Sequence, residues 1–127
     1  MSAANPAVPG TATVPLGRLA KLIRSKNAGP FMLTVDVLFD DAATFGAVVD
    51  ANAIDLATMS DVFGVSEADI QIHVVPPALA IKVSLPRPVP SGAVEDGDVF
   101  GGQQFAPLVE LPVAVPADLV DAHVSER

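Results

Sequence analysis

The stretch FMLTVDVLF, residues 31–39, decides the fold. Every odd-numbered residue in it is large and apolar, while the even-numbered positions include Thr34 and Asp36. Successive side chains of a β-strand point to opposite faces of a sheet. The stretch therefore predicts a strand with one apolar face and one partly polar face.

Two helices are expected after this strand. Asp40 and Asp41 supply capping oxygens for a helix that runs to about Ala51. A second helix is expected over residues 55–63, ended by Gly64. Because a strand face and a helix stripe must bury each other, these two helices are expected to cover the apolar side of the sheet.

Further strands are expected at residues 70–75 and 79–85, joined by a stiff corner at Pro76 and Pro77. Residues 108–115 predict a last strand, which its internal proline weakens. The fold class is therefore α+β: a single compact domain with a mixed or antiparallel sheet of about four strands and two helices packed on one face.

The ends of the chain lack a clear periodic pattern. Residues 1–15 are rich in Ala, Pro, Gly and Thr and predict a flexible N-terminal arm. The single α+β domain is expected at residues 16–115, beginning with a short helix or strand at 16–23. Residues 116–127 predict a tail or a short helix.

Composition limits the class of partner. The 127 residues carry a net charge of −8 at pH 7 and include no cysteine. We expect no nucleic-acid partner, because phosphate binding needs a basic surface, and no disulfide, thiol nucleophile or Cys-ligated metal. The chain shows no signal-peptide pattern and no apolar run of the roughly 20 residues that span a membrane. We therefore expect a cytoplasmic protein with no membrane partner, metal or resident cofactor.

The few cations are grouped. Of seven Lys and Arg residues, one is the last residue of the chain, and the other six fall in two stretches. These six are Arg18, Lys21, Arg24, Lys26, Lys82 and Arg87.

The first stretch continues into residues 24–30, RSKNAGP, which predicts a loop because Asn27, Gly29 and Pro30 disfavour regular structure. Arg24 can clamp a carboxylate or phosphate, and backbone N–H groups of such a loop can form an anion-binding nest. We place Ser25, Lys26, Asn27 and Gly29 in the same candidate ligand-binding site. A surface turn with incidental charges has the same composition.

The polar face of the predicted sheet is the second candidate. The two-residue period places on it Thr34, Asp36, Gln71, His73, Lys82 and Ser84. His73 and Asp36 are candidate acid–base groups. No catalytic triad, paired-carboxylate or nucleotide-binding motif accompanies them. A solvated sheet face without a ligand would show the same alternation.

A proline- and glycine-rich loop over residues 86–107 is the third candidate. Its prolines hold Arg87 with little ordering cost. Two Asp residues in it are expected to pair with cations rather than to bind a metal. The candidate ligand-binding residues of this loop are Arg87, Ser91, Asp98, Gln103 and Gln104, and the second Asp is Asp96. An ordered structural loop packed by its prolines is the alternative.

Five runs of sequence together resemble one known family. They are LGRLAKLIRSKNAGPF (16–31), LTVD (33–36), AIKV (80–83), PRPVPSG (86–92) and GDVFGGQQ (97–104). The chain resembles the domain-of-unknown-function family numbered 4387 from Leu16 to about Val113.

The resemblance implies a partner rather than a reaction. Members of this family look like companions of a larger protein similar to the acyclic-terpene-utilisation family, found in bacterial catabolic gene clusters. That larger family ends in a domain with a similar basic loop before a strand. The family usually has His where this chain has Phe105, which argues against a family-wide catalytic His at that position.

Three functions follow as hypotheses. The first is a small subunit or accessory protein of a bacterial catabolic complex that binds an organic-acid or acyl-CoA-type anion through Arg24, Lys26, Lys82 and Arg87. The second is a stand-alone lyase, hydratase or isomerase acting on a carboxylate, with a CoA thioester as a substrate type and His73 or Asp36 as base. The third is a structural homo-oligomer that binds no ligand.

Overall fold

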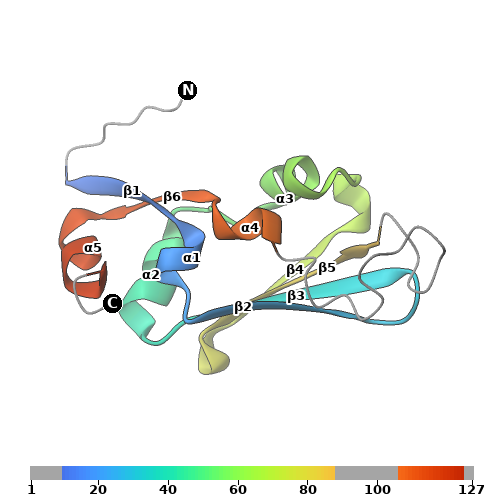
Figure 1. The fold of residues 1–127 in the computed structure, drawn as a ribbon, viewed down its shortest axis with the longest axis horizontal. Helices are drawn as coiled ribbons and strands as arrows, with labels where there is room; N and C mark the ends of the chain where they lie inside the picture. The colour runs from blue at the N-terminus through green and yellow to red at the C-terminus, as the bar shows by residue number, and fades with distance from the viewer. Residues whose placement is uncertain (1–9, 88–105, 125–127) are drawn as a thin grey trace.

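The computed structural model describes residues 10–87 and 106–124 (Figure 1). The elements, in chain order, are β1 (Thr11–Pro15), α1 (Leu16–Leu19), β2 (Leu22–Asn27), β3 (Met32–Leu38), α2 (Ala42–Asp50), α3 (Leu56–Phe63), the 3-10 turn η1 (Glu67–Asp69), β4 (Gln71–Val75), the 3-10 turn η2 (Pro76–Ala78), β5 (Ala80–Pro86), α4 (Ala106–Val109), β6 (Pro112–Pro116) and α5 (Ala117–Val124).

The main sheet has four antiparallel strands in the order β2-β3-β5-β4. Strand β3 lies inside the sheet and pairs with β5 along its whole length and with β2 over residues 33–38. Helices α1, α3 and α4 lie on one side of this sheet in this view, and α2 lies at one end of it (Figure 1). The α+β class and the four-stranded sheet are thus confirmed.

Strand β3 provides the centre of the core, as its alternation predicts. Leu33, Val35 and Val37 are at most 1% exposed, and Phe39 beyond the strand is also buried. The ring of Phe39 meets Phe45 of α2 edge to face, with centroids 5.9 Å apart. The apolar face of the sheet therefore packs against the helix that follows it.

Both predicted helix starts and the predicted helix stop are present. Asp41 caps α2 by accepting from the backbone N–H of Thr44 at 2.8 Å, and Asp55 caps α3 in the same way through Thr58. Gly64 ends α3 in the left-handed conformation, with φ of 69°. Side-chain capping of this kind satisfies backbone donors that a helix leaves unpaired in its first turn.

A second, two-stranded sheet corrects two of the sequence predictions. Residues 11–15, placed in the flexible arm, form β1 and pair with β6; residues 1–9 lie outside the described part. The last strand begins later than predicted, at Pro112, because residues 106–109 form α4. Prolines occupy the ends of this ladder, at the Pro15–Pro112 pair and at Pro116, where a missing N–H costs least. Of the two possibilities for the C-terminal segment, the helix is observed.

The loop predicted at residues 24–30 is wrong. Residues 22–27 are strand β2, and the turn is confined to the residues that follow, where Gly29 has φ of 92°. The exposure of β2 alternates, with Ile23 and Ser25 buried between exposed neighbours. Among residues 10–87 and 106–124, no helix is long and apolar enough to cross a membrane; the cytoplasmic location stays a prediction.

The packing of α1 on α4 gives a first prediction. A Cβ added at Gly17 would lie 2.8 Å from Cγ1 and 3.0 Å from the carbonyl oxygen of Val109, so Gly17→Ala should force the two segments apart. We expect a loss of about 1–3 kcal/mol in the free energy of unfolding, measured by denaturant titration.

The matched control for this substitution is Gly46→Ala in α2, where an added Cβ meets nothing within 4 Å. Alanine favours the helix over glycine by up to about 1 kcal/mol, so this variant should be as stable as the parent or more stable. Equal stability of the two variants would show that α1 and α4 do not pack as described.

The α3 cap gives a pH-dependent prediction. The side chain of Thr58, and then its backbone N–H, donate to the Asp55 carboxylate and lower its pKa below the usual range. Its contribution to stability is therefore complete at neutral pH and is lost as pH falls below about 4, through the lowered pKa of the folded state. Asp55→Ala should cost about 1 kcal/mol at pH 7. The difference from the parent should shrink in thermal melts between pH 4 and pH 2, and a constant difference would contradict this account.

Candidate functional site

The register of the sheet places four polar side chains in one row across all four strands. Arg24 of β2 is opposite Asp36 of β3, Asp36 is opposite Lys82 of β5, and Lys82 is opposite His73 of β4. Directly opposed residues of antiparallel strands share a face and have neighbouring side chains. This row lies on the sheet face opposite to the buried side chains of β3.

Asp36 is the centre of the row. Its Oδ2 accepts from Arg24 Nε at 3.2 Å, and its Oδ1 accepts from Lys82 Nζ at 3.1 Å. The Asp36 side chain is only 5% exposed, whereas the side chains of Arg24 and Lys82 are 60% and 46% exposed. The carboxylate is thus covered, and each cation keeps much of its surface in solvent.

A second polar row lies beside the first. By the same register Lys26 of β2 is opposite Thr34, Thr34 is opposite Ser84, and Ser84 is opposite Gln71. We call the eight side chains of the two rows the open face; they are Arg24, Lys26, Thr34, Asp36, Gln71, His73, Lys82 and Ser84. With neutral histidine the open face carries three positive charges and one negative charge, in a chain whose net charge is −8.

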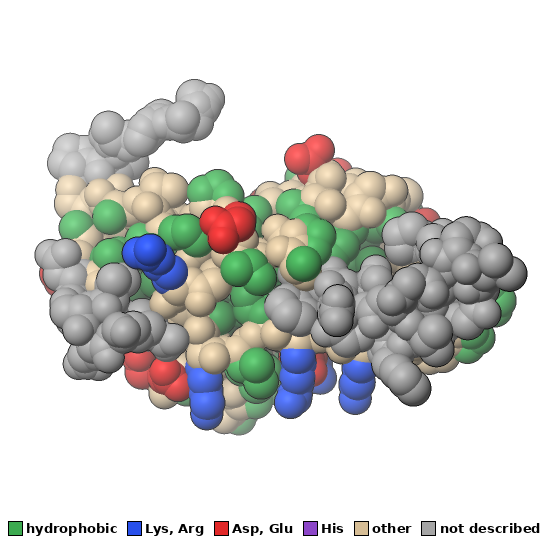
Figure 2. Space-filling model, in the orientation of Figure 1, with side chains coloured by type: hydrophobic (Ala, Val, Ile, Leu, Met, Phe, Trp, Pro, Cys, Tyr) green, Lys and Arg blue, Asp and Glu red, His purple; other side chains and the backbone are tan. Residues whose placement is uncertain are grey.

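Figure 2 shows Lys and Arg side chains projecting from the lower side of the molecule, the side on which Figure 1 draws the sheet without a helix. This agrees with the exposure of Arg24 on β2 and Lys82 on β5, whose side chains are 60% and 46% exposed. A carboxylate or a phosphate approaching this side meets them before it meets the sheet.

The structure divides the site residues that the sequence suggested. Arg24, Lys26 and Lys82 share the open face, whereas Arg87 lies on the other face and is 6% exposed. Arg87 Nη1 donates to Asn27 Oδ1 at 2.7 Å, and Ser25 is buried on that same side. Arg87 therefore joins β2 to the end of β5 and does not belong to the open face.

The rest of the predicted set lies elsewhere. Gly29 is in the exposed turn between β2 and β3. Asp96, Phe105 and four predicted ligand-binding residues lie outside the described part of the chain; the four are Ser91, Asp98, Gln103 and Gln104. Their placement in the site stays a prediction.

The polar face predicted from the strand period is present, but Arg24 and Lys26 were missing from it. They had been assigned to a loop, which has no defined faces. The alternation of apolar Ile23 with charged neighbours was the available signal, since a strand over residues 22–27 puts both cations on the same face of the sheet as Asp36.

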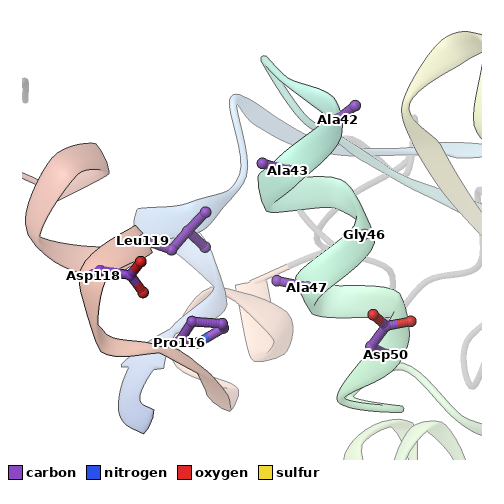
Figure 3. Close-up of a pocket in the computed structure, with 8 residues that line it drawn as sticks. All are labelled: Ala42, Ala43, Gly46, Ala47, Asp50, Pro116, Asp118 and Leu119. Carbon is purple, nitrogen blue, oxygen red and sulfur yellow. The ribbon is translucent and has the colours of Figure 1, made fainter. Parts of the chain in front are cut away.

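Two pockets of the described residues have a different character. One, of about 570 Å³, lies between α2 and the start of α5, where Ala43 and Ala47 face Pro116 and Leu119 (Figure 3). Its charged lining residues are Asp50 and Asp118, so it repels anions. The other, of about 100 Å³, is an apolar pocket beside β4. Neither pocket has a cationic lining residue, and the predicted anion site is not one of them.

The buried carboxylate gives a third prediction. Asp36→Asn keeps the shape of the side chain but leaves Arg24 and Lys82 without a counter-charge, so we expect a loss of roughly 1–3 kcal/mol in unfolding free energy at pH 7. Asp61→Asn, on the exposed side of α3, is the control and should change stability by less than about 0.5 kcal/mol. If the two variants denature at the same urea concentration, the ion pairs do not hold the three strands together.

Comparison with known proteins adds a family. The model of the family described as "Domain of unknown function (DUF4387)" matches residues 16–112. The search of curated proteins and the search of solved structures each gave no match. The similarity to acyclic-terpene-utilisation proteins stays a prediction.

Proposed function

The chain belongs to the DUF4387 family, a domain of unknown function, and we propose from its geometry that it is an accessory subunit of a bacterial catabolic complex that binds an organic-acid or acyl-CoA-type anion on the open face. The observation that carries the proposal is the placement of Arg24 and Lys82 on one buried carboxylate, with their cationic ends half in solvent.

Asp36 holds the side chains of Arg24 and Lys82 in position for a ligand. Arg24 uses Nε to bind Asp36, and its two terminal nitrogens make no hydrogen bond to any other described residue. These nitrogens are the pair with which a guanidinium binds a carboxylate through two hydrogen bonds. Because Arg24 and Lys82 are already held in position, less side-chain entropy is lost when the anion binds.

The position of the open face on a sheet surface supports a subunit over a stand-alone enzyme. The open face lies on a sheet surface, whereas small-molecule sites are usually concave and bury most of their ligand. A second protein laid over the face would close it and exclude water from the anion. In this proposal the larger partner is the acyclic-terpene-utilisation-type protein that the family resemblance implies.

A stand-alone lyase, hydratase or isomerase is the second candidate, and His73 is the observation in its favour. His73 is exposed on the open face, next to Lys82 in the same row, so it can reach a substrate held by the cations. Asp36 is a weaker candidate base because both of its oxygens accept from cations. In the third candidate, a structural oligomer, the same face binds no ligand.

A thermal-shift screen against organic acids and CoA esters tests the proposal, since a ligand that binds the folded state raises the melting temperature. We expect an anion that stabilises the parent to stabilise Arg24→Gln/Lys82→Gln much less, with an affinity loss of at least about tenfold. Turnover of such a ligand by the isolated chain would favour the enzyme.

The control is Arg18→Gln, which removes an exposed cation of α1 away from the sheet. This variant should respond to the ligand like the parent. An equal loss of response in Arg18→Gln would mean that anion binding depends on the net charge of the chain and not on the open face, and the proposal would fail.

A further inference from the structure

The two edges of the main sheet differ in charge. The β2 edge carries Arg24 and Lys26, and cations on an edge strand oppose pairing with another chain. The β4 edge, with the sequence QIHVV, has no acidic or cationic residue other than a histidine, and its Val74 is 46% exposed. Within the described residues β4 pairs with β5 alone.

The hydrogen-bond pattern shows which groups of β4 point outward. The N–H of Arg87 donates to the carbonyl of Phe31, and that of Phe39 to the carbonyl of Leu79, so odd-numbered residues of β5 bond to β3. Hydrogen-bonded residues alternate between the two neighbours of an inner antiparallel strand. Even-numbered residues of β5 therefore bond to β4, and their partners there are Gln71, His73 and Val75.

Ile72 and Val74 consequently present their backbone N–H and C=O groups at the outer edge of the sheet. We propose that a second copy of this chain pairs with β4 there, antiparallel and about a two-fold axis at His73. In that register Ile72 of each copy is opposite Val74 of the other. Each residue donates its backbone N–H to the C=O of the residue opposite and accepts from the N–H of that residue. The resulting ladder is self-complementary, as a two-fold interface requires.

The side chains of the edge fit the same arrangement. Ile72 and Val74 lie on the apolar side of the sheet, where the 100 Å³ pocket is lined by Val74, Val48 and Ile54 among others. The partner's Ile72 would cover Val74 beside this pocket and remove exposed apolar surface from water. The result is an eight-stranded sheet whose open faces join into one surface.

Sedimentation or light scattering of the whole chain tests the proposal. The parent should have twice the 13.0 kDa chain mass at micromolar concentration. Val74→Lys should raise the dimer dissociation constant at least about tenfold, because an inward-pointing lysine opposes edge pairing. Leu22→Lys is the matched control: Leu22 is also 46% exposed but lies on the other edge strand, so this variant should remain dimeric.

A second variant covers the case in which Val74→Lys does not fold. His73→Glu places a carboxylate opposite Lys82 within its own sheet, which favours the monomer fold. In the dimer the two introduced glutamates, one from each copy, are directly opposite each other at the axis. Their Cα atoms are about 4.5 Å apart there, the spacing of a non-hydrogen-bonded pair, so their carboxylates repel each other. This variant should be monomeric and should recover dimer at high salt.

Three results would overturn the proposal: a monomeric parent, a dimer that survives both β4 substitutions, or a dimer lost in Leu22→Lys. The anion response of the Val74→Lys monomer separates this proposal from the proposed function. If Val74→Lys is monomeric but anions still raise its melting temperature, both proposals are supported. If the dimer behaves as expected but no anion raises the melting temperature, only the edge pairing is supported.

Discussion

One buried carboxylate organises the sheet face that the helices leave open. Asp36 joins β2, β3 and β5 through ion pairs of 3.2 and 3.1 Å. A charge in this position would be costly without partners, because burial removes its hydration. The two cations supply that compensation. The placement of Arg24 and Lys82, and any anion they bind, therefore depends on Asp36.

The opposite face of the same three strands is held by a different cation. Arg87 is buried there and donates to Asn27, which ties the end of β5 to β2 across the strand between them. Of the cations in the two predicted stretches, Arg87 is thus buried, whereas Arg24 and Lys82 are partly exposed to solvent. The distinction follows from strand parity, since Arg87 directly follows β5 and lies an odd number of residues from Lys82.

Prediction from the sequence succeeded where a few consecutive residues contain the whole pattern, as in strand alternation or helix capping. The alternation around Val35, the capping pattern at Asp41 and Asp55, and the left-handed stop at Gly64 are local, and all are present in the structure. It failed where pairing with a distant segment determines whether a stretch forms a strand. Strand β1 exists because β6, about a hundred residues later, pairs with it. Strand β2 carries loop-forming residues only at its end, and pairing with β3 extends it through Asn27.

The error at β2 also explains why the candidate site was predicted only in part. Six residues of the open face followed from the strand period, but two cations assigned to a loop could not be given a side. Once Arg24 and Lys26 are placed on β2, the face changes from a balanced polar surface with one cation and one carboxylate to a positive one. As far as the described residues form it, this positive sheet surface on a chain of net charge −8 is poorly suited to enclosing a small substrate alone. Such a surface could meet an anion that a second protein brings to it or helps to enclose, which is the reason for proposing a subunit rather than a complete enzyme.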